Sequence, residues 1–376
     1  MAKPRSAHHS DRHFDYLFLF CTIFLVIFGL VMLSSASFDL GKKKYNDPYY
    51  YLKHQLLVGL IFGGLGFLFA SNFNYLRWEK LSFILLLINI LLLILVFIPG
   101  LSYQSGSASR WLKLGSFSFQ PAELLKFTFI IYLAAWLSKK KQRKTAFIDG
   151  LLPFLVISLI IAVLVLKQPA TATLVIVLAS ALVVYFVSGA KFKYIVLIIL
   201  IGAILFSIVI YKSNYRRERV QTFIEKFFLK KDVDILDKGF HIRQSLMAIG
   251  SGKLFGVGFG KSIIKYRSLP ETVGDSIFAV IAEELGFVGS VILIGLYALL
   301  FFRGLKIAQK SKDEFGRLTV IGLISVVSFQ VFVHIGANTG LLPFTGVPLP
   351  FISYGGTALA VFLTMMGVIV NISKYS

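Results

Sequence analysis

Long apolar runs are the feature of this chain that most restricts its fold. Such windows fall at about residues 15–36, 54–71, 81–98, 122–138, 151–166, 171–188, 192–211, 276–302, 318–338 and 351–371. Each is close to the roughly 20 residues that a helix needs to cross a bilayer, where every backbone hydrogen bond must close within the segment. The runs are too long for barrel strands. We therefore predict an all-α polytopic membrane protein of about ten transmembrane helices, with residues 1–376 forming a single membrane domain.

The composition agrees with a membrane protein and excludes a soluble domain. Hydrophobic residues make up 57% of the chain, charged residues only 15%, and the mean hydropathy is +0.79. A chain of this kind can hide its apolar surface only in lipid. The single cysteine, Cys21, excludes an intramolecular disulfide. The net charge of +21 does not indicate nucleic-acid binding, because the basic residues lie in short loops and form no separate basic domain.

The basic residues also predict the orientation in the membrane. With the amino terminus in the cytoplasm, the basic clusters at 139–144 and 303–317 both fall in cytoplasmic loops, as the positive-inside rule requires. The short outer loops hold far fewer basic residues, with Lys42, Lys43 and Lys44 as the main exception. Because the number of spans is even, both termini are expected in the cytoplasm.

One connection is much longer than the others. Residues 212–274, between the seventh and eighth spans, are of mixed polarity and are predicted to form a long extracytoplasmic loop. A loop of this length is usually either functional or disordered, and its apolar content and regular glycines argue against disorder. Within it, residues 216–228 place aromatic residues on one side and cations on the other, which suits a helix lying in the lipid headgroup layer.

A pair of ionisable residues within the fourth span is a candidate functional site, since charges inside membranes are expensive. Glu123 and Lys126 follow Pro121, which suits the first turn of a helix, and their three-residue spacing places them on one face. They form either a structural ion pair that helps the helix tolerate its own charges or part of a polar site. The residues alone leave both interpretations open.

A second candidate is Asp275, where the long loop meets the membrane and the eighth span begins. In one interpretation it caps the amino terminus of that helix, a position at which Asp is preferred. In the other it is a carboxylate at the lipid–water boundary that can act as a general base on a sugar hydroxyl. Glu283 and Glu284, about two turns deeper, are expected to bond to loop backbone or to a cation rather than to act in catalysis.

The third candidate is the proline- and glycine-rich stretch at 339–357, which cannot continue a helix. It predicts either a broken or re-entrant outer segment that lines a polar cavity or packs on protein, or a plain outer turn. His334, in the preceding span, is expected to be a hydrogen-bonded buried residue rather than a ligand. No cluster of His, Cys and carboxylate residues has metal-ligand spacing, and the absence of a phosphate-binding loop argues against ATP hydrolysis.

Several of these segments belong to blocks that, in this order, closely resemble the SEDS family (shape, elongation, division and sporulation). The blocks are SRWL at 109–112, FQPAE at 119–123, QSLMAIGSG at 244–252, LPE at 269–271 with Asp275 after it, AEELG at 282–286 and PLPFISYGG at 348–356. The resemblance covers nearly the whole chain. The character of residues 277–289 favours the division type (FtsW) slightly, whereas residues 345–348 lean towards the elongation type (RodA).

The resemblance implies a peptidoglycan glycosyltransferase that polymerises lipid II at the outer face of the bacterial cytoplasmic membrane. In this reaction a sugar 4-hydroxyl of the acceptor attacks the anomeric carbon of the donor and displaces undecaprenyl pyrophosphate. Asp275 falls on the family's essential aspartate and would deprotonate or orient the attacking hydroxyl. The residues expected to bind substrate are Arg110, Glu123, Lys126, Gln244, Lys265, Glu271 and Ser353, with Arg110, Lys126 and Lys265 offsetting the pyrophosphate charge.

The chain departs from the family pattern at three places. Gly274 and Ser276 flank Asp275, where the family usually has a polar residue before the aspartate and an aromatic one after it. Ala170 replaces a usual family aspartate in the turn at 169–173, and Thr357 is followed by alanine where many members have a second hydroxyl residue.

The family also implies partners, and other functions remain open. The expected partners are lipid II, a class B penicillin-binding transpeptidase with one membrane span, and other membrane proteins of the division or elongation machinery. A divalent cation such as Mg²⁺ or Mn²⁺ would suit the pyrophosphate, although the sequence shows no site for one. The alternatives are a flippase that moves the same precursor across the bilayer and a non-catalytic membrane scaffold.

Overall fold

The computed structural model describes residues 14–105, 108–114, 117–139, 146–213, 217–218, 220–221, 240–262 and 271–375. Among these residues, nine helices are long and apolar enough to cross a membrane, and one shorter apolar helix, Thr171–Val187, brings the number to the ten predicted spans. The predicted all-α fold class is therefore confirmed.

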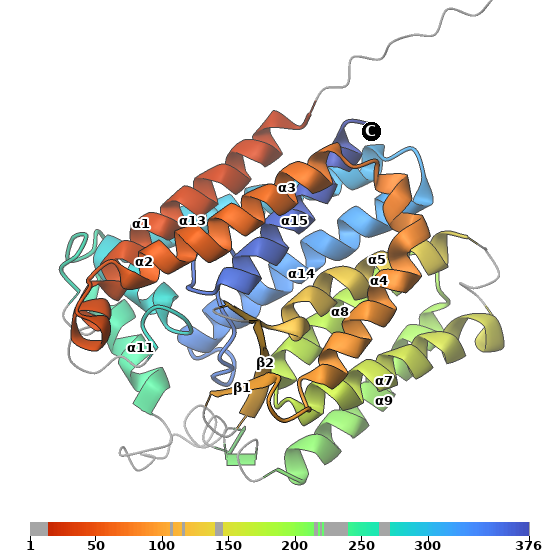
Figure 1. Cartoon of the computed structure of the whole chain (residues 1–376), viewed down its shortest axis with the longest axis horizontal. Coiled ribbons are helices and arrows are strands. Elements are labelled where there is room, and N and C mark those ends of the chain that lie inside the picture. Colours follow the sequence, from red (N-terminus) through yellow and green to blue (C-terminus); the bar gives the residue numbers. More distant parts are fainter. Residues whose placement is uncertain are drawn as a thin grey trace, which may run out of the picture.

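The helices of the described residues form one bundle (Figure 1). They are α1 (Tyr16–Tyr45), α2 (Tyr50–His54), the π-helical η1 (Gln55–Ile61), α3 (Phe62–Asn72), α4 (Tyr75–Leu95), α5 (Pro121–Ser138), the π-helical η2 (Phe147–Leu151), α7 (Leu152–Lys167), α8 (Thr171–Val187), α9 (Phe192–Tyr211), α11 (Phe240–Ser251), α13 (Ile277–Lys310), α14 (Glu314–Asn338) and α15 (Gly356–Ser373). Two spans are composite, because α2, η1 and α3 are continuous, as are η2 and α7.

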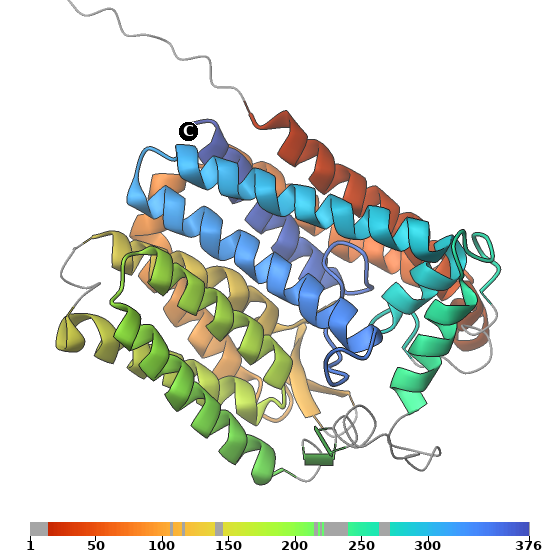
Figure 2. The same cartoon turned by 180° about the vertical axis from the view of Figure 1, so that it is seen from behind.

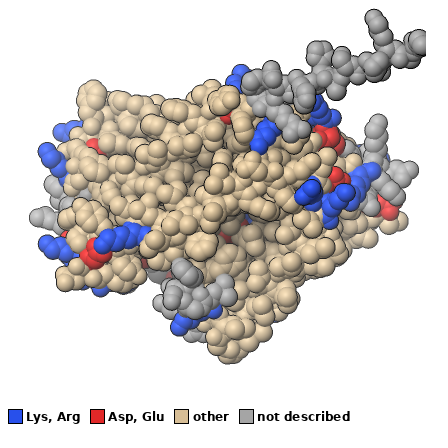
Figure 3. All heavy atoms as spheres, turned by 45° about the horizontal axis from the view of Figure 1, so that its top comes forward, with Lys and Arg blue, Asp and Glu red and all other residues tan. Residues whose placement is uncertain are grey.

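The helices differ greatly in how deeply they are buried. Most residues of α5, α14 and α15 are buried, so these helices form the centre of the bundle. In contrast, α9 buries only Tyr194 and Ile195 and lies at the outer edge of the bundle in Figure 2. The charged side chains visible in Figure 3 gather towards the margins of the molecule and leave a broad uncharged surface between them. An uncharged surface of this kind suits contact with lipid.

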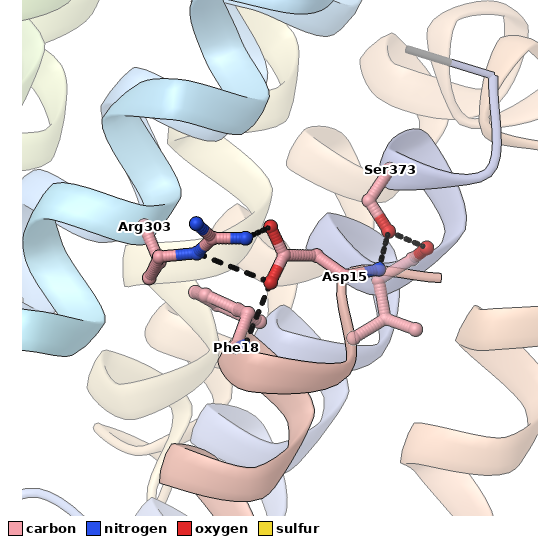
Figure 4. Close-up of polar contacts among 5 residues, drawn as sticks. Asp15, Phe18, Arg303 and Ser373 are labelled. Carbon is pink, nitrogen blue, oxygen red and sulfur yellow. Dashed lines mark hydrogen bonds and ion pairs between the residues drawn. The ribbon is translucent and has the colours of Figure 1, made fainter. Parts of the chain in front are cut away.

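The two ends of the described chain meet at one end of the bundle, which we call the terminal end. The Asp15 carboxylate accepts a hydrogen bond from Phe18 N (2.9 Å) and forms an ion pair with Arg303 of α13 at 2.6 Å (Figure 4). The Asp15 N–H donates to Ser373 Oγ of α15 at 3.3 Å. One residue therefore caps α1 and joins it to two other helices.

A small antiparallel sheet lies at the opposite end, which we call the sheet end (Figure 1). Its strands are β1 (Ser102–Ser105), β2 (Ala108–Leu114) and β3 (Phe117–Phe119), in the order β1-β2-β3, with Leu112 opposite Phe119 in the register. The sequence did not predict this sheet. Of the long connection at 212–274, the structure describes α11 and short flanking pieces, and α11 packs against α13 and α14. Most of the predicted headgroup helix at 216–228 lies outside the described residues.

Candidate functional site

Asp275 belongs to a tight turn, residues 271–276, that leads into α13. The amides of Gly274 and Ser276 both donate to Glu271 O, at 3.1 and 3.2 Å, and Glu271 itself has a positive φ of 48°. Ser276 occupies the cap position of α13 and makes no side-chain capping bond. The structure therefore places Ser276 at the cap position and Asp275 one residue before it. Its side chain is half-buried just before the helix begins.

The backbone between α14 and α15 packs against this turn, and we call residues 339–355 the broken segment. It is non-helical, as predicted. Ser353 Oγ donates to Gly274 O at 2.7 Å and accepts from Leu349 N at 2.7 Å, while Tyr354 N donates to Val273 O at 2.8 Å. The structure therefore brings Ser353 and Glu271 together with Asp275, through backbone contacts of the turn.

Gly346 of the broken segment lies directly beside the Asp275 side chain. A Cβ atom built on Gly346 would be 3.0 Å from Asp275 Oδ2, and Gly346 has a φ of +65°. Both observations favour glycine, which tolerates a positive φ and has no side chain. The backbone of the broken segment can therefore approach the carboxylate closely.

Glu123 and Lys126 form a fully enclosed ion pair within α5. Lys126 Nζ donates to both carboxylate oxygens of Glu123, at 2.7 and 2.8 Å, and to Gln330 Oε1 of α14 at 2.7 Å. Lys126 is 0% exposed and Glu123 is 3% exposed. The amide group of Gln330 donates onward to Pro348 O at 2.8 Å. The pair is thus connected through Gln330 to the broken segment.

Arg110 lies on β2 and contacts the turn between α7 and α8. Its Nε donates to Gln168 O at 3.0 Å and its Nη2 donates to Pro169 O at 2.9 Å. The same turn is anchored to α4, because Gln168 Nε2 donates to Leu93 O at 3.0 Å. Arg110 therefore holds a positive charge at the turn that precedes Ala170.

The two remaining predicted residues are less defined. Gln244 is half-buried on α11, which packs against α13 and α14, whereas Lys265 lies outside the described residues. Among the residues that the structure describes, no three His, Cys, Asp or Glu side chains are grouped so that they could hold a metal ion.

The sequence reasoning missed a break in α13. Gly286 has φ 69° and ψ −166° inside this helix. A neighbouring loop replaces the helical hydrogen bonds there: Phe287 N donates to Lys253 O at 2.9 Å, and Gly258 N donates to Glu284 O at 3.1 Å. The break separates a short helical piece, which follows Asp275, from the rest of α13.

Both glutamates beside this break are buried and hydrogen-bonded. Ser35 of α1 donates to the two carboxylate oxygens of Glu284, at 2.7 and 2.8 Å, and Ser262 donates to the Glu283 carboxylate. Their backbone carbonyls also accept hydrogen bonds from Val257 N and Gly258 N of the loop, whereas the expected bonding of the carboxylates to loop backbone or to a cation stays a prediction. These contacts tie the short piece of α13 to α1 and to the loop.

The fold and the site together define the class to which this protein belongs. It is a polytopic membrane protein in which a carboxylate-bearing turn and a broken segment meet where two central helices end. The chain belongs to the FtsW/RodA/SpoVE family of cell cycle proteins, and the model of that family matches residues 15–376.

Individual relatives match along almost their whole length. The chain is 37% identical over 362 residues to stage V sporulation protein E of Bacillus subtilis, covering 96% of this chain and 97% of the relative. It is 37% identical over 361 residues to the probable peptidoglycan glycosyltransferase FtsW of Geobacter sp. M18, covering 96% of each.

Solved structures show the same fold. The rod shape determining protein RodA of Thermus thermophilus matches with a TM-score of 0.70 and 28% identity over 96% of each chain. A chain from a structure described as the coordination of polymerization and crosslinking by a peptidoglycan synthase complex matches with a TM-score of 0.78 and 28% identity, covering 96% of this chain and 97% of that chain.

Proposed function

We propose that this chain is a peptidoglycan glycosyltransferase that polymerises lipid II. The observation that carries the proposal is the arrangement around Asp275, a half-buried carboxylate on a turn that is fixed by hydrogen bonds from the broken segment. A general base needs such fixed placement within reach of the hydroxyl that it serves. Relatives that carry the name of this activity support the same conclusion.

In the proposed reaction Asp275 takes the proton of the acceptor's sugar 4-hydroxyl as that oxygen attacks the anomeric carbon of the donor. The bond between the anomeric carbon and the pyrophosphate oxygen breaks, and undecaprenyl pyrophosphate leaves with the bonding electron pair. A positioned general base typically contributes about 10²–10⁴-fold to such a step. Glu271, which is exposed at the start of the turn, and Gln244 are proposed to contact the sugars or the peptide of the substrate.

The negative charge of the leaving group requires cations nearby. We assign this role to Arg110, which is held at the turn before Ala170, and to Lys265. Lys126 is enclosed and bonded to Glu123 and Gln330, so its proposed role is to support the broken segment through Gln330. The described residues offer no grouped metal ligands, and no step is assigned to a metal; Mg²⁺ or Mn²⁺ carried by the pyrophosphate stays a prediction.

The setting follows from the same proposal. The protein would lie in the bacterial cytoplasmic membrane with its terminal end in the cytoplasm and its sheet end outside. A class B penicillin-binding transpeptidase is the proposed partner, because the structure of a peptidoglycan synthase complex described as coordinating polymerization and crosslinking contains a chain of this fold. The named relatives, FtsW and stage V sporulation protein E, favour division or sporulation over elongation.

The test is synthesis of glycan strands from purified lipid II by the detergent-solubilised protein with its transpeptidase. We expect wild type and Asp47→Ala, a control in the α1–α2 turn, to make strands, and Asp275→Ala to make none. Equal synthesis by Asp275→Ala would remove this residue from catalysis. If wild type makes no strands but transfers labelled lipid II across the membrane of vesicles, the protein is a flippase. If wild type shows neither synthesis nor transfer, the non-catalytic scaffold is the alternative that remains.

A further inference from the structure

One face of α14 carries three buried polar side chains at four-residue spacing, Gln330, His334 and Asn338. Residues four apart lie on the same side of a helix. None of the three is more than 1% exposed. The large majority of buried polar side chains in proteins make at least one hydrogen bond. We call these three residues the α14 polar row.

Each member of the α14 polar row bonds to non-helical backbone near Asp275. Gln330 Nε2 donates to Pro348 O at 2.8 Å, and His334 Nδ1 donates to Val347 O at 2.6 Å. These two bonds fix the broken segment immediately after Gly346, the residue beside the Asp275 carboxylate.

The third member acts on the other side of the carboxylate. Asn338 Nδ2 donates to the backbone carbonyl of Asp275 at 2.9 Å. One helix face therefore sets the positions of both backbone pieces that adjoin the Asp275 side chain. A displacement of about 1 Å in such a position can reduce a catalysed rate by about 10²-fold.

A purely structural role does not explain Asn338 well, because burying its amide group costs stability. Its amide group donates to Asp275 O and to His334 O, the latter at 3.0 Å, but its Oδ1 has no hydrogen-bond partner among the described residues. A buried acceptor without a partner costs about 1–3 kcal/mol. An apolar side chain of similar size, such as Leu, would avoid this loss of stability. However, it could not donate a hydrogen bond to the Asp275 carbonyl.

We propose that Asn338 is a positioning residue for Asp275, holding the turn so that the carboxylate faces the substrate hydroxyl. This inference rests on the catalytic role proposed for Asp275. The amide of Asn338 does not act on the substrate; it acts through the backbone of the residue that does.

A matched control is available at the other end of the bundle. Asn371 of α15 is also buried, at 1% exposed, and it makes two hydrogen bonds: its Oδ1 accepts from Tyr75 N at 3.0 Å and its Nδ2 donates to Ser71 O at 2.7 Å. Asn371→Leu and Asn338→Leu are therefore the same substitution at equally buried sites, one at the terminal end and one at Asp275.

The experiment measures three quantities for wild type, Asn338→Leu, Asn338→Asp and Asn371→Leu in complex with the transpeptidase. They are kcat and KM for lipid II, the melting temperature, and hydrogen–deuterium exchange of the peptide at 271–280. For both Asn338 variants we expect kcat to fall about 10–100-fold, KM to change less than about two-fold and exchange at 271–280 to rise. For Asn371→Leu we expect a larger fall in melting temperature, with kcat and exchange at 271–280 near wild type.

The possible results separate this inference from the proposed function. Unchanged exchange at 271–280 in Asn338→Leu, or a kcat within two-fold of wild type, would overturn the positioning role. Equal losses of kcat in Asn338→Leu and Asn371→Leu would also overturn it, because they would reflect stability alone. If wild type makes no strands while exchange at 271–280 still rises in Asn338→Leu, the proposed function fails but the contact between Asn338 and the turn stands.

Discussion

Removing one member of the enclosed ion pair should destabilise the protein much more than neutralising both. In Lys126→Met the Glu123 carboxylate, which accepts two of the three Nζ hydrogen bonds, is left charged at an almost inaccessible site. Breaking a buried pair in this way typically costs about 3–5 kcal/mol, because a buried charge is left without compensation. Gln330 Oε1 also loses its donor.

The double variant Lys126→Met with Glu123→Gln removes both charges and should recover most of this loss. What remains is the unpaired Gln330 acceptor, which accounts for about 1–3 kcal/mol. Unfolding in mixed micelles can be followed by tryptophan fluorescence, because the Trp78 ring packs edge-on against Phe127, the neighbour of Lys126, with ring centroids 5.3 Å apart. Equal losses in the single and double variants, or a loss below about 1 kcal/mol in Lys126→Met, would refute the assignment of an uncompensated charge.

Two further predictions concern the break in α13. Gly286→Ala places a Cβ against Gly256 N at a positive φ, so we expect a loss of more than about 2 kcal/mol in unfolding free energy, whereas Gly295→Ala, with open space around it, should be neutral or slightly stabilising. Ser35→Ala removes the hydroxyl that donates to Glu284 and should cost about 1–3 kcal/mol, while Ser34→Ala, at a half-buried site where the hydroxyl donates to Val31 O of the same helix, should cost less than about 0.5 kcal/mol. The stability of each variant and its control is measured by thermal unfolding in detergent. If the controls lose as much stability as the test variants, the contacts at Gly286 and Ser35 do not stabilise the protein as proposed.

Features that depend on local sequence were well predicted. Apolar runs gave the ten spans, since the length of an apolar run is a property of consecutive residues. The three-residue spacing of Glu123 and Lys126 predicted their contact, and the prolines at 343, 348 and 350 predicted the non-helical broken segment.

Features that depend on contacts between residues far apart in the sequence were not predicted. The backbone groups beside the break at Gly286 bond to Lys253 and Gly258, which lie 33 and 28 positions before Gly286, and no local pattern reports such pairing. The α14 polar row could have been found from the sequence, because Gln330 and Asn338 are polar residues in an apolar span. Of the three residues, only His334 was singled out from the sequence. The sheet at Ser102–Phe119 was not predicted, since three short strands give little periodicity.

The most direct test of the proposed function uses Asp275→Asn. This variant keeps the size of the side chain and the backbone carbonyl that Asn338 holds, and removes only the basic carboxylate. We would measure binding of lipid II and strand synthesis on the same preparation. The proposed function predicts binding within about two-fold of wild type and synthesis reduced about 10²-fold or more. Strand synthesis at the wild-type rate would contradict the assignment of Asp275 as the general base.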